Sequence, residues 1–581
     1  MLSPKTPGVY IEEISKLPAS IAPVATAIPA FVGYTENVTT DEGEDLTNKP
    51  TRIMSFLDYI EIFGGSFEES LTVTLANSSS NPDNRIISVA ASTLSPYSLY
   101  YHLQMYFQNG GGPCYIVSVG AHVASPTDSN IDVVELSAGL AAVEQEDEVT
   151  LLVVPEAVIL SNANRKTLYD AMLDQCTRLQ DRFSIFDVIA DEDDTVYNDG
   201  VGFRNTDIGS DNLKYGAAYY PSLVANLNYS TSDGKVTIDD QRLINEYAVA
   251  ASLEKVLNGD ITADPAFGTF VIENNSKIDG DMFSVGAFSV TEGTEFTKGA
   301  NRTLTATALA LALDGLDASF SATSSGRTVT VKATTAGTVG NLITLTYTDS
   351  GTGVAVIVSG ATLSGGTIGT APDVELYNNI KLEMKKLFVR LYPSATIAGV
   401  YARVDNDRGV WKAPANVSLS LVRKPVIQVS HEDQGNLNVD ATSGKSINAI
   451  RTFAGKGVLV WGSRTLAGND NEWRYVPVRR LYIFVEESVK KATEFVVFEP
   501  NDAKTWMRVK TMIENFLTSL WKKGALAGAK PEHAFFVKVG LGETMTYQDI
   551  LNGIMNIEIG MAAVRPAEFI ILKFSHKIVN A

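Results

Sequence analysis

Short apolar runs alternate with helical stretches over residues 21–260, and this alternation constrains the fold more than any other feature of the sequence. Helical patterns lie at Ser95–Gln108 and Asn164–Gln180. The apolar runs between them are rich in β-branched residues, as strands buried on both faces are. We therefore expect an α/β or α+β multidomain chain in which helices cover the sheets. The four clearest strand-like runs are Ala30–Tyr34, Cys114–Val119, Leu151–Pro155 and Phe183–Val188.

Residues 265–372 differ in composition from the segments on either side. Positions 271–370 hold 19 Thr, 14 Gly and only 13 charged residues. Polar and apolar residues alternate over Arg327–Ala333 and Ile343–Tyr347, as in strands with one buried face. We predict an inserted, small β-rich domain with one helix near Ala306–Leu313, because α/β-type sequence resumes after residue 372.

Each end of the chain carries a strand-like run. Pro4, Pro7 and Pro18 bracket the N-terminal run and exclude a helix there. A lone strand leaves its backbone groups unpaired, so this run must join a sheet of its own chain or of a neighbour. The residues of the two runs are Val9, Tyr10, Ile11, Glu12 and Glu13 at the N-terminus, and Phe569, Ile570, Ile571, Leu572, Lys573 and Phe574 at the C-terminus.

These patterns divide the chain into an N-terminal arm at 1–20, a middle α/β domain at 21–264, the insertion at 265–372 and a C-terminal domain at 373–581. The C-terminal domain contains an amphipathic helix at Lys504–Lys523. Its apolar residues share one face at about 100° per residue. The opposite face carries the basic residues Lys504, Arg508 and Lys522.

Charge and composition exclude several classes of protein. The 581 residues include 47 Lys and Arg but 67 Asp and Glu, a net charge of −20, so a general binder of nucleic acids or anionic membranes is not expected. Residues 121–260 hold 25 acids and 9 bases, whereas the last 81 residues hold 7 acids and 10 bases. The N-terminus has no apolar segment of a signal peptide and no run of 18 apolar residues occurs, so we expect neither secretion by this route nor membrane insertion.

No motif predicts an enzyme, a metal site or a cofactor site. Gly444-Lys445-Ser446 resembles the end of a P-loop, but the first glycine of that motif is replaced by Val439; an exposed lysine in a loop is the alternative. Asn109–Pro113 is expected to be a tight helix-to-strand connection. His431-Glu432 lacks the second histidine of a zinc motif, and Asp191–Asp194 reads as a solvated acidic loop. Cys114 and Cys176 are expected to be buried thiols.

Several motifs, taken together and in order, resemble those of phage tail sheath proteins. The resemblance covers residues 1–35, 100–120 and about 400–581, and 150–260 more loosely, whereas 265–372 departs from the family. Arg408–Asn416, with the sequence RGVWKAPAN, is the most recognisable of the motifs. The other matching segments are Thr6–Glu13, Ala27–Gly33, Ser446–Arg451, Val460–Leu466, Tyr475–Arg480, Phe498–Asn501 and Arg565–Ile570.

The resemblance implies a subunit of a contractile sheath, in a phage tail or a phage-derived injection system. In that family both terminal arms join a sheet of the C-terminal domain in adjacent subunits. Partners would be further copies of the chain, an inner tube protein, and baseplate and tail terminator or cap proteins, after synthesis in the bacterial cytoplasm. The basic face with Lys504, Arg508 and Lys522 could contact the tube, with a solvated helix face as the alternative, and the acidic 121–260 region and the insertion would face outward.

Two other classes of function remain open from the residues alone. A surface-layer or fibre subunit would suit the Thr- and Gly-rich insertion, although the RGVWKAPAN segment does not favour it. An enzyme with a site assembled from distant residues would leave no local motif.

Overall fold

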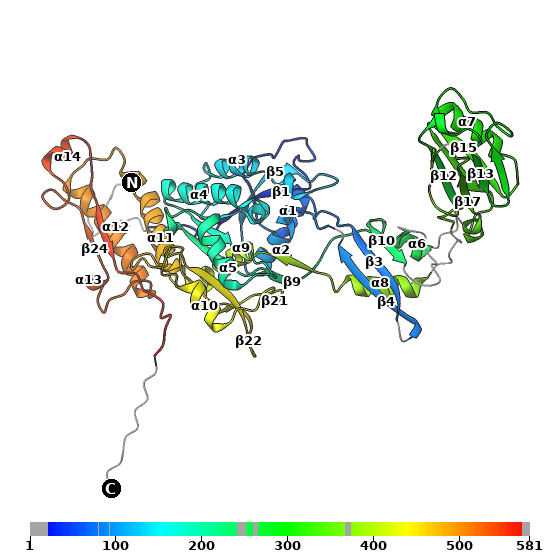
Figure 1. Cartoon of the computed structure of the whole chain (residues 1–581). Helices are drawn as coiled ribbons and strands as arrows, with labels where there is room; N and C mark the ends of the chain where they lie inside the picture. The colour runs from blue at the N-terminus through cyan, green and yellow to red at the C-terminus, as the bar shows by residue number, and fades with distance from the viewer. Residues whose placement is uncertain are drawn as a thin grey trace, which may run out of the picture. The chain divides into compact units, whose positions relative to one another are not determined.

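The computed structural model describes residues 21–78, 81–91, 93–240, 251–258, 265–351, 353–366 and 373–571 (Figure 1). The described chain forms two compact units. One unit takes the residues up to 67, 95–227 and those from 389 onward, and the other takes 68–94 and 228–388. The predicted strand Val9–Glu13 lies outside the described residues, as do Leu572, Lys573 and Phe574.

A nine-stranded sheet is the centre of the first unit. Its inner strands pair in parallel and its outer strands antiparallel, and the four strand-like runs of the sequence form β5, β1, β6 and β7. The mixed helix and strand fold is thereby confirmed. In spatial order the strands are β2 (Thr51–Ile53), β5 (Cys114–Ala121), β1 (Pro29–Thr35), β6 (Leu151–Val153), β7 (Phe183–Asp187), β8 (Gly216–Tyr220), β22 (Ile447–Phe453), β23 (Gly457–Val460) and β20 (Val417–Ser418).

This sheet joins segments that the sequence divides between two domains. β8 and β22 pair in parallel through Ile447 to Ala449, so residues 447–460 continue a sheet built from residues 29–220. Parallel strands need no nearby sequence partner, and no local pattern reveals such a pairing. The elements of the insertion, by contrast, all come from one continuous stretch of sequence between residues 265 and 366.

Helices cover both faces of the sheet (Figure 1). α3 (Val133–Val143) packs against α4 (Asn162–Leu179), and α2 (Leu99–Gln108) packs against α9 (Ser394–Arg408). Buried acids fix the helix starts: Asp187 Oδ1 accepts from the Ser394 N–H at 2.8 Å, and Glu156 Oε1 accepts from the Ser98 N–H at 2.9 Å. Burial raises the pKa of each of these two carboxyls to about 7.

Smaller elements complete the first unit. α1 (Phe56–Phe63) and α10 (His431–Asn438) both begin with a capping box, in which a serine side chain and the third helical residue satisfy each other's backbone donors. α5 spans Val196–Gly202. A three-stranded sheet takes the order β19 (Phe388–Leu391), β9 (Leu223–Asn228) and β21 (Val422–Pro425).

The C-terminal elements build a separate small core in this unit. α12 (Ala503–Lys522) confirms the predicted helix, and its apolar face packs with α11 (Val476–Thr493) (Figure 1). Phe484 of α11 and Phe516 of α12 place their ring centroids 6.0 Å apart. Beyond them lie α13 (Pro531–Ala534), β24 (Phe535–Lys538), α14 (Tyr547–Leu551) and β25 (Glu558–Met561).

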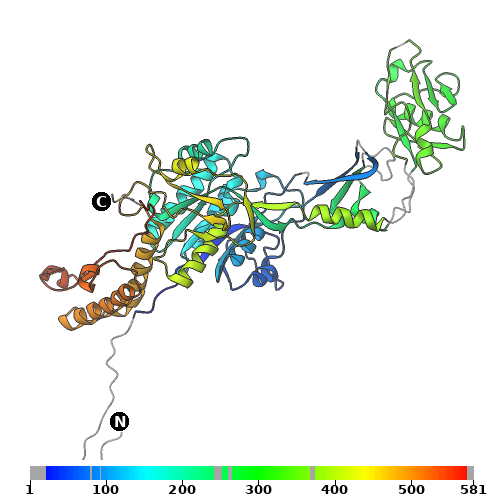
Figure 2. The same ribbon diagram turned by 90° about the horizontal axis from the view of Figure 1, so that it is seen from below.

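The second unit has two hydrophobic cores. One lies beneath a sheet of order β11 (Ala251–Ser252), β10 (Val236–Asp240), β3 (Leu71–Ser78) and β4 (Asn81–Ala91), with α6 (Leu253–Asn258) and α8 (Val374–Met384). The other belongs to the β-rich insertion, shown in green in Figure 1 and Figure 2. Its elements are β12 (Phe267–Ile272), β13 (Met282–Val285), β14 (Phe288–Thr291), α7 (Arg302–Leu313), β15 (Phe320–Ser325), β16 (Thr328–Ala333), β17 (Leu345–Thr348) and β18 (Val356–Val358).

The two ends of the insertion meet. Phe267 and Ser364 form a β-bridge, and a Cβ added to Gly366 would lie 3.0 Å from the backbone nitrogen of Ala266. An inserted domain requires this proximity because the host chain must enter and leave at one point.

Candidate functional site: open strands and arm roots

The C-terminal region presents an incomplete sheet. β24 and β25 pair antiparallel from Phe535↔Met561 to Lys538↔Glu558, and among the described residues no third strand joins them. Val537 is buried against α12. A two-stranded sheet is marginally stable in water, and further strands are the usual remedy.

Alternate residues along each strand direct their backbone N–H and C=O groups toward the partner strand or toward the outer edge of the pair. The Ala562 N–H donates to the Ala534 carbonyl at 2.8 Å, so the alternation turns the backbone groups of Val537 and Met561 away from the partner strand. On the β25 side, the Tyr482 hydroxyl donates to the Met561 carbonyl at 2.7 Å. On the β24 side, no described strand pairs with the outer edge.

The C-terminal run pairs with no described strand where it leaves this region. Phe569, Ile570 and Ile571 are 70%, 79% and 80% exposed and form no strand within the chain. A strand needs a partner beside it, so the pairing of this run with a neighbouring subunit stays a prediction. Contiguous exposed apolar side chains are uncommon on monomeric proteins.

A charged clamp holds the chain just before this run. The Arg464 guanidinium donates to Glu568 through Nε at 2.9 Å and Nη2 at 2.6 Å, and Asn438 Nδ2 donates to the same carboxylate at 2.7 Å. Burial opposes ionisation, but the hydrogen bonds from Arg464 and Asn438 prevail and hold the pKa of Glu568 below its usual value. The clamp fixes the point at which the C-terminal arm leaves the body.

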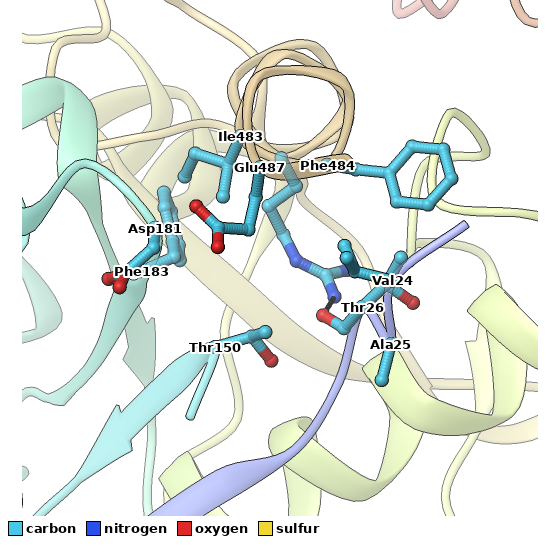
Figure 3. Close-up of a pocket in the computed structure, with 10 residues that line it drawn as sticks. Val24, Ala25, Thr26, Thr150, Asp181, Phe183, Ile483, Phe484 and Glu487 are labelled. Carbon is cyan, nitrogen blue, oxygen red and sulfur yellow. Dashed lines mark hydrogen bonds between the residues drawn. The ribbon is translucent and has the colours of Figure 1, made fainter. Parts of the chain in front are cut away.

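The N-terminal chain is fixed in a comparable way at Thr26. Arg480 Nη2 donates to the Thr26 carbonyl at 2.7 Å and also pairs with Asp405 at 2.6 Å, both side chains being 4% exposed. Figure 3 shows Val24, Ala25 and Thr26 beside α11. The cavity between them holds only about 20 Å³, room for about one water molecule. This contact is therefore an attachment and not a ligand site.

Motifs that are far apart in the sequence meet at a cavity of about 730 Å³. The RGVWKAPAN segment contributes Lys412, Ala413, Ala415 and Asn416, and the C-terminal segment contributes Pro566 to Ile570. Between them lie Trp461, Ser463 and Tyr475. The quoted motifs thus surround the root of the C-terminal arm, which sequence spacing alone did not reveal.

The three residues of the predicted basic face of α12, Lys504, Arg508 and Lys522, are exposed. Arg508 stacks on Phe495, 4.5 Å from the ring centroid, and neither Lys504, Arg508 nor Lys522 forms an ion pair with a described residue. Asp502 caps the helix by accepting from the Thr505 N–H at 2.9 Å. The exposure of these three residues agrees with the predicted basic face. Its contact with an inner tube stays a prediction.

The remaining sequence candidates have structural roles. Lys445 is buried, and its Nζ donates to the carbonyl oxygens of Arg204 and Ile208. The expectation of an exposed lysine in this loop is therefore wrong, because the ammonium satisfies carbonyl groups of a neighbouring segment. Gly110, at φ 101°, makes the tight connection between α2 and β5. The thiols of Cys114 and Cys176 are buried and free.

Metal-binding clusters and membrane-spanning helices are both absent from the described residues. No group of three or more His, Cys, Asp or Glu side chains is placed to hold a metal ion there. Within the same residues, no helix combines the length and apolar character that crossing a membrane requires.

Comparisons with known proteins agree on one family. Residues 468–577 match the phage tail sheath C-terminal domain. The tail sheath protein of Vibrio phage KVP40 is 28% identical over 130 residues, 22% of this chain and 19% of that protein. The tail sheath protein of Burkholderia phage BcepMu is 26% identical over 190 residues, 29% of this chain and 39% of that protein. The matches thus span from a fifth to two-fifths of these relatives.

Solved structures extend the similarity over the whole chain. The PVC sheath complex of an extracellular contractile injection system, in its contracted state, shares 25% identity at a TM-score of 0.51, covering 100% of this chain and 99% of that one. The contracted helical sheath of the anti-feeding prophage shares 28% identity at a TM-score of 0.53, covering 99% and 100%. The resemblance to contractile tail sheath proteins is thereby confirmed, by the family match at residues 468–577 and in fold over the whole chain.

Proposed function

We propose that this chain is a structural subunit of a contractile sheath, in a phage tail or an injection particle, and not an enzyme. The subunits polymerise helically around an inner tube and contract to drive the tube through a target envelope. The observation that carries the proposal is the open β24–β25 pair beside an exposed, unpaired C-terminal run. The comparisons with sheath proteins support it.

In this proposal the arms complete the sheets of neighbouring subunits. Residues 9–13 and 569–574 each add a strand to a β24–β25 pair of another copy, by main-chain hydrogen bonds. Each such bond contributes about 1 kcal/mol net, so one arm is a modest link. Repeated at every subunit, the links form a mesh that stays connected while the compact units rotate.

Contraction needs an extended state that is less stable than the contracted one. The arm roots at Glu568 and Thr26 are fixed, whereas the arms themselves lie beyond them, so the arms act as hinges. Baseplate proteins would trigger the change at one end, and a terminator or cap protein would close the other.

Negative-stain microscopy of the purified chain tests the proposal. We expect tubes of uniform width with a cog-wheel cross-section. Ile570→Pro removes an N–H that a paired strand needs and should abolish the tubes without changing the melting temperature, whereas Ile570→Val should form them normally. Monodisperse small particles from the unaltered chain, or normal tubes from Ile570→Pro, would overturn the proposal.

A further inference from the structure

A basic groove lies between the RGVWKAPAN segment and the C-terminal elements. It encloses about 310 Å³ and its charged lining residues are Arg408, Lys412, Lys523 and Arg565. The lining contains no acidic residue. All four cations are exposed, and none forms an ion pair with a described residue.

The groove is a built feature and not a chance meeting of surface lysines. Gly409 has φ 92°, and a Cβ at this position would lie 2.4 Å from the Trp411 indole, so glycine is required for the indole to pack here. Val410 is buried in the C-terminal core. The Lys412 N–H donates to the Gly409 carbonyl at 2.9 Å and closes the turn.

The groove continues the line of β25. Val564 and Pro566 line it, while the Val564 N–H donates to the Ala525 carbonyl at 3.2 Å on the inner side. β25 ends at Met561, and the three steps from Met561 to Val564 cover about 10 Å of extended chain, so a strand added to the β24–β25 pair would end close to the groove. A partner strand whose apolar residues are followed by acids would pair with the sheet through the apolar residues and place the acids in the groove.

We propose that this groove receives Glu12 and Glu13 of the N-terminal arm from a second copy of the chain. The proposal rests on the strand exchange proposed above and assigns the arm its position. The arm has the required order, with Val9, Tyr10 and Ile11 followed by the two acids. Adjacent residues of a strand point to opposite sides. The cations come from three parts of the chain, Arg408 with Lys412, then Lys523, then Arg565, so that each of the two glutamates meets a positive charge.

Chemical cross-linking between two variants tests which segment occupies the groove. A Glu12→Cys chain is mixed with a Lys412→Cys chain, assembled, and treated with a short bis-maleimide; the native Cys114 and Cys176 are 0% exposed and do not compete. We expect a covalent dimer, and none when Lys456→Cys, on the exposed β22–β23 turn, replaces Lys412→Cys. A dimer of Asp193→Cys with Lys412→Cys and none with Glu12→Cys would overturn the proposal in favour of the acidic loop.

A charge exchange separates this proposal from the strand exchange itself. Lys412→Glu with Arg565→Glu should raise the concentration needed for assembly at least tenfold, and Glu12→Lys with Glu13→Lys in the same chain should restore it. If Ile570→Pro abolishes the tubes but the reversal of the groove has no effect, the groove assignment alone is wrong. If neither change affects assembly, the strand exchange is wrong as well.

Discussion

At the scale of single residues, two buried arginines fix the roots of the two arms. Arg464 holds Glu568, 104 residues away in sequence, and Arg480 holds Asp405 and the Thr26 carbonyl. Each arginine offers several donors in a planar fork, so that one side chain satisfies two acceptors at once. In the proposed strand exchange, these two contacts hold the chain next to each arm in place.

Glu568→Gln tests the C-terminal clamp. Hydrogen bonds to a charged group contribute about 1.5–3 kcal/mol, so loss of the carboxylate charge should speed protease cleavage at residues 565–571 several-fold. Glu558→Gln is the control, because its ion pair with Lys538 is exposed and long, at 3.9 Å. Equal cleavage of the Glu568→Gln variant and the unaltered chain would contradict the clamp.

The clamp also has a defined pH dependence. The pKa of Glu568 is lower in the folded chain than in the unfolded one, so its stabilisation is complete above the unfolded pKa of about 4.3. It is lost as the pH falls through the lowered folded pKa. Protection from an acid-active protease should therefore weaken only at strongly acidic pH, and Glu568→Gln should remove that dependence.

At the scale of elements, the periodicity of apolar residues predicted the helices and strands that local interactions determine. α12 and the buried strands of the central sheet follow from the spacing of apolar residues within one segment. The pairing of β8 with β22, the buried state of Lys445 and the clamp depend on residues more than 100 positions apart, and no spacing rule contains that information. The motifs of the C-terminal region indicated where a site lies, but not that they surround one cavity.

Reversal of charge on α12 tests the basic face. We predict that Lys504→Glu with Arg508→Glu weakens assembly on the tube protein, because exposed charges interact across a salt-screened interface, and that added salt weakens the unaltered complex in the same direction. The change should not unfold the helix, since both side chains are exposed. Lys456→Glu is the matched control, and full-length sheaths on tubes from the double variant would contradict the prediction.

At the scale of the whole molecule, the proposed contacts for assembly belong to one compact unit. The β24–β25 pair, the basic groove and both arm roots lie in the unit that contains the nine-stranded sheet. The insertion lies in the other unit, has a hydrophobic core of its own and closes its ends on each other. Its fold therefore does not depend on the contacts that we assign to assembly.

Removal of the insertion tests this division. A chain in which residues 266–366 are replaced by a short Gly-Ser linker should still form tubes, because Ala266 and Gly366 already lie side by side and no strand of the nine-stranded sheet is cut. The excised segment 265–366 should unfold cooperatively by itself, since a separate core makes a separate two-state transition, and calorimetry of the full chain should show the same transition. A linker variant that keeps the remaining calorimetric transitions but no longer forms tubes would contradict this division. The insertion would then lie at a subunit interface, because its core would fold independently while its surface would be needed for assembly.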